Sequence, residues 1–226
     1  MSALDTRATY QRIAPFYDLL DFPFEYGRYR RLRARVFDGL SGAVLDAGVG
    51  TGRNMPFYPE DCQITGIDLS SAMLTRAARR RARFAGEITL ACMDVCRTAF
   101  ADHRFDGVVA TFLFCVLSED AQLSALGELA RVCKPEGEIR ILEYVESGNR
   151  RRRFVMRLLA PWAGWAYGAA FDRHTERYLS EAGLALVETR FVYDDVIKLI
   201  IARPAAPMSP GYRRRETRRD RSRRTP

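Results

Sequence analysis

Three alternating glycines follow an acidic residue near the start of the chain, directly after a short apolar run. The acid is Asp46, and the glycines are Gly48, Gly50 and Gly52. Glycine lets a strand turn sharply into a helix and lets the backbone approach a bound molecule closely. Asp46 would place a hydrogen-bond acceptor at the carboxyl end of the strand, where α/β sheets bind their ligands. This spacing predicts a ligand-binding turn, and the alternative is a structural turn that ends in a solvated acid.

The glycine spacing separates two kinds of ligand. A dinucleotide-binding turn has the pattern G-x-G-x-x-G, which would need glycine or alanine where the chain has Arg53. A pyrophosphate site is therefore disfavoured. The pattern D-x-G-x-G-x-G instead resembles motif I of the class I S-adenosylmethionine-dependent methyltransferases. That resemblance implies a loop that wraps the methionine moiety of S-adenosylmethionine, where no phosphate has to be neutralised.

Further residues fall where this resemblance needs them. Asp68 follows the apolar segment 64–67, about 20 residues after Gly48, where an acid meets the ribose hydroxyls in this sheet topology. Asp94 resembles the acid that accepts the adenine amino hydrogen. The cofactor-binding set that the resemblance implies comprises Tyr17, Asp46, Gly48, Gly50, Gly52, Asp68, Leu69, Met73, Asp94, Val95 and Thr111.

A parallel sheet must bring these residues together, and the rest of the chain has the pattern of one. Apolar runs alternate with amphipathic ones between Val44 and Ala202, which predicts an α/β fold with a doubly wound, mainly parallel, seven-stranded sheet. The expected strands are 43–46, 64–68, 87–92, 106–111, 137–144, 184–192 and 195–202. The expected helices are 53–58, 70–84, 119–134 and 175–182. The last two strands would form an antiparallel hairpin.

Length and composition suit one domain with two short appendages. The chain has 226 residues and a formal net charge of +8. Residues 1–42 lack strand periodicity and predict a helical lid, and residues 43–203 predict the Rossmann-like methyltransferase domain. Residues 204–226 hold eight arginines against Glu216 and Asp220 and are nearly free of apolar residues. Such a segment cannot repay the entropy of ordering, so a disordered tail is expected.

Cysteine and histidine usage argues against a metal site. The chain has five cysteines without a C-x-x-C pair and only two histidines, of which His103 is expected in a turn. The cysteines mostly lie in apolar runs and the N-terminal residues do not resemble a secretion signal, which together predict a cytoplasmic protein. The weakly charged stretch 154–171 contains Arg157 and Pro161, so we expect it to lie at an interface or in the core and not to span a membrane.

Two clusters combine arginines with aromatic residues. Residues 22–33 alternate the two kinds, and residues 150–167 begin with four arginines and continue into an aromatic, amphipathic segment. Aromatic rings favour the headgroup layer of a membrane, and arginines favour an anionic leaflet. Both clusters are predicted to hold the protein peripherally on the cytoplasmic membrane, and the alternative is a pair of solvated faces with core aromatics. No specific nucleic acid is expected, and the oligomeric state stays open.

The opening of the chain bears on the substrate. Residues 9–18 resemble the entrance helix of the quinone-biosynthesis methyltransferases and of the bacterial phospholipid N-methyltransferases, with Tyr17 covering the cofactor. The match is closest to the phospholipid enzymes, which convert phosphatidylethanolamine stepwise to phosphatidylcholine. The resemblance therefore implies a phospholipid amine as substrate. Residues 9–40 are expected to form a lid that closes over cofactor and lipid.

Candidate substrate residues lie on the entrance helix and beyond the later strands. Glu143 and Tyr144 are predicted to face the amine, and Tyr26 and His174 complete the predicted catalytic set. Guanidinium and imidazole groups donate well to phosphate. The lipid phosphate is accordingly assigned to Arg28, Arg173 and His174. The alternative for His174 is a capping or packing role before the following helix.

Three other functions stay open. C-methylation of a prenylated quinone precursor would explain the same amphipathic clusters but needs no phosphate site. The run 54–59 also resembles membrane-associated thiol methyltransferases, so a small thiol is another candidate substrate. A non-catalytic scaffold that binds membrane or RNA is the alternative outside the enzymes. The intact set of Asp46, Asp68, Asp94 and glycines argues against that scaffold.

Overall fold

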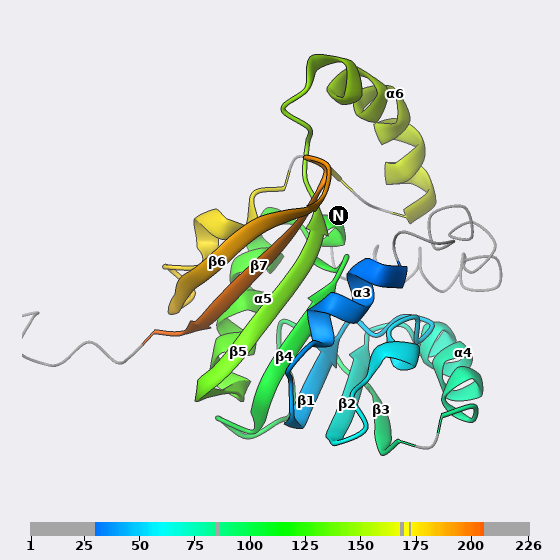
Figure 1. The fold of residues 1–226 in the computed structure, drawn as a ribbon, viewed down its shortest axis with the longest axis vertical. Helices are drawn as coiled ribbons and strands as arrows, with labels where there is room; N and C mark the ends of the chain where they lie inside the picture. Colours follow the sequence, from blue (N-terminus) through cyan, green and yellow to red (C-terminus); the bar gives the residue numbers. More distant parts are fainter. Residues whose placement is uncertain (1–29, 85, 168–169, 172, 206–226) are drawn as a thin grey trace, which may run out of the picture.

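The computed structural model describes residues 30–84, 86–167, 170–171 and 173–205, which are built around a seven-stranded sheet of order β3-β2-β1-β4-β5-β7-β6 (Figure 1). The strands are β1 Gly42–Ala47, β2 Cys62–Asp68, β3 Ile88–Cys92, β4 Phe105–Thr111, β5 Cys133–Tyr144, β6 Leu184–Tyr193 and β7 Ile197–Pro204. Strands β1 to β5 are parallel, and β7 runs antiparallel between β5 and β6. The predicted doubly wound, mainly parallel sheet is confirmed.

Helices cover both faces of this sheet. The helices α3 Arg30–Phe37 and α4 Ser71–Arg81 supply residues to one core, and α5 Glu119–Val132 supplies residues to the other. In the described part of the chain, three short 3-10 helices join the larger elements, namely η2 Met55–Phe57, η3 Phe114–Val116 and η4 Thr175–Tyr178. The helix α6 Arg150–Tyr167 follows β5 and projects away from the sheet (Figure 1).

The central strands are apolar on both sides, which fixes where a ligand can bind. In β4, Val108 and Ala110 belong to the core under α5, whereas Val109 belongs to the core under α3 and α4. Continuous apolar runs of this kind are typical of parallel strands that are covered on both faces. With both faces covered, the carboxyl ends of the strands are left as the place for a site.

Some predicted helices are shorter in the structure. The expected helix 53–58 is the single turn η2, because Pro56 opens it and the extended residue Tyr58 precedes Pro59. The expected helix 175–182 is the short η4, and α4 ends at residue 81 in place of 84. The helix α5 ends at Val132 because the next residues are extended ahead of Pro135, so β5 begins earlier than predicted.

The predicted lid is described by the structure from residue 30 onward, and this C-terminal part of it belongs to the domain core. Val36 and Phe37 of α3 are 0% and 1% exposed and lie in one cluster with Val44 and Leu142. Arg140 on β5 also donates to the carbonyl oxygen of Val36 at 3.0 Å. The helix α3 is therefore packed on the sheet. The predictions for residues 1–29 and 206–226 lie outside the described residues.

Two further findings concern the described part of the chain. None of its helices has the length and hydropathy that crossing a membrane requires. Within the same residues, no three His, Cys, Asp or Glu side chains gather as the ligands of a metal ion would. His103 lies in a turn, as predicted, with a positive φ of 55°.

Candidate functional site

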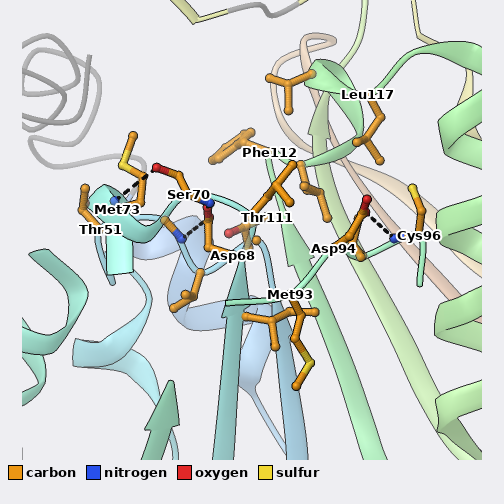
Figure 2. Close-up of a pocket in the computed structure, with 18 of the residues that line it drawn as sticks. Thr51, Asp68, Ser70, Met73, Met93, Asp94, Cys96, Thr111, Phe112 and Leu117 are labelled. Carbon is orange, nitrogen blue, oxygen red and sulfur yellow. Dashed lines mark hydrogen bonds between the residues drawn. The ribbon is translucent and has the colours of Figure 1, made fainter. Parts of the chain in front are cut away.

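A pocket opens at the carboxyl ends of the parallel strands, above the glycine turn (Figure 2). It encloses about 1100 Å³ of empty space, with the open solvent at its mouth included. The turn after β1, the end of β2, the loop after β3 and the end of β4 form its walls. The predicted cofactor-binding residues that line it are Gly48, Gly50, Asp68, Leu69, Met73, Asp94, Val95 and Thr111. Tyr17 lies outside the described residues.

The glycine turn is tied to the neighbouring strand. The amides of Gly48 and Val49 both donate to the carbonyl oxygen of Ile67 at 2.9 Å. The amide of Gly50 donates to Asp68 Oδ2 at 3.0 Å. Gly48 and Gly50 have positive φ angles of 76° and 54°, which residues with a side chain rarely adopt. The turn therefore presents backbone to the pocket.

Gly52 has a different role from the one predicted, because it does not line the pocket. A Cβ atom at this position would lie 2.7 Å from Met55 Cε and 3.4 Å from the backbone of Ala77 on α4. Its φ angle is also positive, at 81°. Gly52 thus allows the turn to pack closely against η2 and α4, and the prediction of direct cofactor contact is corrected.

Asp68 is the best-placed hydrogen-bond acceptor in the pocket. Its Oδ1 accepts from the amide of Ser70 at 2.8 Å, and its Oδ2 accepts from the amide of Gly50 at 3.0 Å. Burial raises the pKa of Asp68 to about 6, although these two amide bonds oppose the shift. A carboxylate oxygen can accept more than one hydrogen bond. Asp68 can therefore accept hydroxyl groups of a ligand while the backbone amides hold it in place.

Asp94 lies on another wall of the same pocket (Figure 2). Its Oδ1 accepts from the amide of Cys96 at 2.9 Å, which fixes the carboxylate just beyond β3. Met93, Val95 and Leu117 line the pocket beside it. An acceptor at the edge of an apolar slot suits a flat heterocycle that carries an amino group.

Asp46 is buried below the pocket and does not line it. Asn54 Nδ2 donates to both of its carboxylate oxygens, at 3.1 and 2.9 Å, and the Tyr58 hydroxyl donates to Oδ2. Burial raises the pKa of Asp46, and these hydrogen bonds oppose the shift. The predicted direct contact between Asp46 and the cofactor is therefore corrected, because Asp46 holds Asn54, which in turn accepts a hydrogen bond from the pocket-lining Arg33.

Arg33 lines the pocket, and the sequence interpretation missed it. Its side chain lies among the buried polar groups at 6% exposure, and its Nη1 donates to Asn54 Oδ1 at 2.8 Å and to Thr111 Oγ1 at 3.2 Å. The guanidinium also lies 5.2 Å from the ring centroid of Phe112. Arg33 and Leu32 belong to the cluster that was predicted to face a membrane, and both turn inward. The available sequence signal was the spacing of Leu32, Val36 and Phe37, which places these apolar residues on one face of a helix that the structure buries.

Among the predicted substrate residues that the structure describes, Tyr144 contacts the pocket lining. Its ring stacks on that of Phe112, with centroids 4.7 Å apart, and Phe112 lines the pocket. The ring of Phe171 meets Tyr144 edge-on at 5.9 Å. These three rings form an aromatic group that reaches from the pocket toward the segment after α6.

Glu143 points elsewhere than predicted. It is fully buried and outside the pocket lining, and its Oε2 accepts from Thr175 Oγ1 at 2.8 Å. Among the described residues, its Oε1 has no hydrogen-bond partner. Burial raises the pKa of Glu143 to about 8. The predicted contact with the substrate amine is corrected, because Glu143 fastens η4 to the end of β5.

The other predicted substrate residues are not gathered in one place. Arg173 is half-buried, with Nη1 3.9 Å from Glu119 Oε1, and it is absent from the pocket lining. His174 is exposed and precedes η4 without a side-chain capping bond. Tyr26 and Arg28 lie outside the described residues. The structure thus assembles the cofactor pocket but does not assemble a phosphate site from the described candidates.

Comparisons with known proteins agree with this geometry. Residues 44–137 match the family model described as a methyltransferase domain. A phosphatidylethanolamine N-methyltransferase from Cereibacter sphaeroides is 34% identical over 163 residues, which cover 68% of this chain and 79% of that protein. The chain belongs to the class I S-adenosylmethionine-dependent methyltransferases. This methyltransferase is also 32% identical to a demethylmenaquinone methyltransferase from Thermobifida fusca over 189 residues, covering 79% of the chain and 78% of that protein.

A solved structure shows the same fold. It is the 1,6-didemethyltoxoflavin-N1-methyltransferase from Burkholderia thailandensis, with bound 1,6-didemethyltoxoflavin and S-adenosylhomocysteine. The methyltransferase superposes on it with a TM-score of 0.66 at 18% identity, covering 91% of this chain and 92% of that chain. S-adenosylmethionine is the cofactor of this methyltransferase.

The residues of the pocket fit this cofactor. Asp68 has the acceptor capacity for two ribose hydroxyls, and Asp94 stands beside an apolar slot for the adenine. The glycine turn brings bare backbone to the region between Asp68 and Thr111. Carboxylates in the site also suit a cofactor that carries a sulfonium and an ammonium group.

Proposed function

We propose that the methyltransferase N-methylates phosphatidylethanolamine and its mono- and dimethyl derivatives toward phosphatidylcholine at the surface of the cytoplasmic membrane. The observation that carries this proposal is the exposed apolar face of α6. That face consists of Phe154, Val155, Leu158, Leu159 and Trp162. The side chains of Phe154 and Leu158 are 69% and 70% exposed. The helix begins shortly after the carboxyl end of β5, so it lies at the edge of the sheet where the pocket opens.

The arginines of α6 divide into two groups. Arg152 pairs with Asp195 at 2.6 Å and Arg157 pairs with Glu146 at 2.7 Å, so these arginines fix the helix to the domain. Arg150 and Arg151 are exposed and make no ion pair with any described residue. No acidic residue occurs in 150–167. Of the predicted basic collar at 150–153, Arg152 and Arg153 are thus engaged with the domain, and Arg150 and Arg151 keep a charge suited to anionic lipid.

The aromatic group beside the pocket suits an amine that gains methyl groups. Rings of Phe112, Tyr144 and Phe171 lie between the cofactor pocket and the segment after α6. Aromatic faces attract methylated ammonium ions by cation–π interaction. This attraction supports successive binding of the mono- and dimethyl lipids, which are cationic when protonated.

The protein's contribution to methyl transfer is positional. S-adenosylmethionine supplies a methyl group activated by the sulfonium, and displacement requires the attacking nitrogen in line with the breaking bond. S-adenosylmethionine would be held by Asp68, Asp94 and the glycine turn, and the lipid amine would be oriented by the aromatic group. Glu143 is not assigned as a base because it lies outside the pocket lining. Water can take the ammonium proton before the transfer.

C-methylation of a prenylated quinone precursor is the second candidate. It is favoured by the similarity to the demethylmenaquinone methyltransferase from Thermobifida fusca. A prenylated substrate would also lie in a membrane, so the apolar face of α6 is compatible with both substrates.

The decisive experiment offers both substrates in one format. Purified full-length protein is incubated with radiolabelled S-adenosylmethionine and vesicles of phosphatidylethanolamine and phosphatidylglycerol, and separately with vesicles that contain demethylmenaquinone. Label in mono-, di- and trimethylated phospholipid supports the proposal. Label confined to the quinone would replace it with the second candidate. If neither lipid is labelled while S-adenosylhomocysteine binds, both proposals are wrong and small thiols are tested next.

A further inference from the structure

Two carboxyl groups share one cation at the end of β5. Glu143 on β5 pairs across the sheet with Lys198 on β7. The ammonium of Lys198 lies 2.5 Å from Glu176 Oε1 on η4, so this charge is already balanced. Glu143 is 0% exposed, and among the described residues its Oε1 has no hydrogen-bond partner. A second negative charge buried at this place would be costly.

The surroundings of Glu143 decide which of the two acids holds a proton. Glu176 is partly exposed and has the ion pair, whereas Glu143 is fully buried. The buried thiol of Cys115 on η3 also interacts with Glu143, and burial raises the pKa of this thiol to about 12, which keeps it neutral. Arg173 has its Nη1 3.9 Å from a carboxylate oxygen on α5. Burial is the main reason that the pKa of Glu143 is raised to about 8.

The hydrogen bonds around Thr175 require a donor that a neutral Glu143 supplies. Thr175 Oγ1 lies 2.8 Å from Glu143 Oε2 and 3.2 Å from Gln122 Oε1. Gln122 Nε2 donates to the carbonyl oxygen of Phe114 at 3.3 Å. Exchanging the amide oxygen and nitrogen would bring two acceptors together, so Gln122 Oε1 is the acceptor that faces Thr175.

The single hydroxyl hydrogen of Thr175 cannot serve two acceptors. The side chains of Glu143, Thr175 and Gln122 are all 0% exposed, so bulk solvent supplies no other donor. Both contacts of Thr175 are therefore hydrogen bonds only when Glu143 carries a proton and donates it to the Thr175 oxygen.

We propose that Glu143 is a neutral carboxylic acid in the folded protein and that its proton positions η3, which borders the cofactor pocket. Glu143 donates to Thr175, and Thr175 donates to Gln122. Gln122 in turn donates to Phe114, the first residue of η3. This chain joins β5 and η4 to α5 and η3. The proposal holds whichever molecule accepts the methyl group.

The segment that contains η3 is part of the pocket. Leu113 before it, Val116 at its end and Leu117 after it line the pocket, and Figure 2 shows Leu117 there. When Glu143 is ionised it can only accept, so the hydrogen of Thr175 turns toward it. The amide of Gln122 then loses the donor that orients it, and η3 is held less firmly. Loss of the Glu143 proton should therefore weaken cofactor binding.

The protonation state can be measured at the carboxyl carbon itself. Nuclear magnetic resonance of full-length protein, labelled with carbon-13 only in the glutamate carboxyl groups, excludes the aspartates. The signal that Glu143→Gln removes belongs to Glu143, and it should stay that of a neutral acid until the pH approaches about 8. Glu176→Gln should lower the pH of this transition, because Lys198 then faces Glu143 alone. Glu181→Gln is the control, because Glu181 is exposed and should leave the transition unchanged.

Cofactor affinity tests the positioning role. Calorimetry measures Kd for S-adenosylhomocysteine at pH 7 and pH 9 with wild-type protein, E143Q and Thr175→Val. Glutamine is an uncharged donor of the same shape as the neutral acid, so E143Q should keep the wild-type Kd at pH 7. From pH 7 to pH 9 the wild-type Kd should rise about 5- to 10-fold more than that of E143Q, which lacks the titrating group. T175V interrupts the chain and should bind weakly at both pH values.

Two results would overturn the proposal. A carboxylate signal for Glu143 at pH 6 would show that the group is ionised in the folded protein. Equal rises of Kd in wild-type protein and E143Q would show that the proton does not position η3. Should circular dichroism show that E143Q is unfolded, T175V decides. The carboxyl signal that it shifts most is then that of Glu143, and wild-type affinity of T175V at both pH values would contradict the positioning role.

Discussion

The helices α3 and α6 have similar compositions and opposite surroundings. Both combine arginines with large apolar side chains. In α3, Val36 and Phe37 are buried against the sheet, whereas in α6 Phe154 and Leu158 are largely exposed. The difference comes from what lies opposite each helix, because α3 packs over β4 and β5 while α6 projects from the end of the fold (Figure 1). An arginine-rich amphipathic pattern therefore does not by itself indicate a membrane surface.

The largest expected effect tests this difference with a matched pair of phenylalanines. Phe37→Ala should lower the free energy of unfolding by about 3 to 5 kcal/mol, because Phe37 is 1% exposed and its ring packs edge-on against Tyr58 at 5.1 Å. Phe154→Ala should change it by less than about 0.5 kcal/mol, because Phe154 is 69% exposed. Urea denaturation of both variants measures the difference. Comparable losses would show that α6 is packed in solution.

The next effect concerns membrane binding through α6. Leu158→Glu should weaken partition into vesicles of phosphatidylglycerol and phosphatidylcholine by about 10- to 100-fold, the contribution of one buried leucine. Leu186→Glu is the matched control, because Leu186 is 49% exposed but lies on β6. Cosedimentation with the vesicles measures both. If the two variants bind equally well, the apolar face of α6 is not the membrane contact.

The cofactor side should respond to pH through Asp68. Its pKa of about 6 means that the carboxylate is ionised above pH 6 and able to accept ribose hydroxyls, and protonated below. The Kd of S-adenosylhomocysteine should therefore rise by up to about tenfold for each pH unit below 6. Asp68→Asn should bind weakly at every pH and lose this dependence. Calorimetry from pH 5 to 8 checks both curves, and a parallel pH dependence in D68N would assign the titration to another group.

The last expected effect concerns the strand that leads into α6. Glu143 has a pKa of about 8 in the folded protein and an ordinary value of 4.5, so between these values the folded state holds a proton that the unfolded state has lost. Its contribution makes stability fall as pH rises through this window. Glu143→Gln should remove that part of the slope. Denaturation midpoints at pH 5.5, 7 and 8.5 measure it, and identical slopes would mean that Glu143 is ionised throughout.

Local patterns made the cofactor side predictable. The turn residues Gly48 and Gly50 are adjacent in sequence to the strand that presents them, and Asp68 ends the next strand. Alternating apolar and amphipathic runs also identified the parallel sheet. The helix ends were less predictable, because prolines and packing decide where a helix stops.

Contacts between distant segments explain what the sequence could not show. Arg33 meets Thr111 across 78 positions of sequence and Asn54 across 21. Asp46 has the position expected of a ligand-binding acid, but Asn54 and Tyr58 turn its carboxylate inward. Composition likewise could not distinguish α3 from α6, since neither pattern specifies the surface opposite the helix.

The attachment of α6 has a mechanical consequence. Asp195, in the turn between β6 and β7, accepts from the Ser147 hydroxyl at 2.6 Å, from the Asn149 amide at 3.1 Å and from Arg152 at 2.6 Å. These bonds all lie at the N-terminal end of the helix, so this end of α6 is fixed to the β6–β7 hairpin. Force applied to its apolar face is transmitted to the hairpin, whose β7 lies beside β5 in the sheet. The angle between α6 and the hairpin therefore sets the tilt of the domain on any flat surface that the helix enters. The same angle sets the distance of the pocket mouth from that surface.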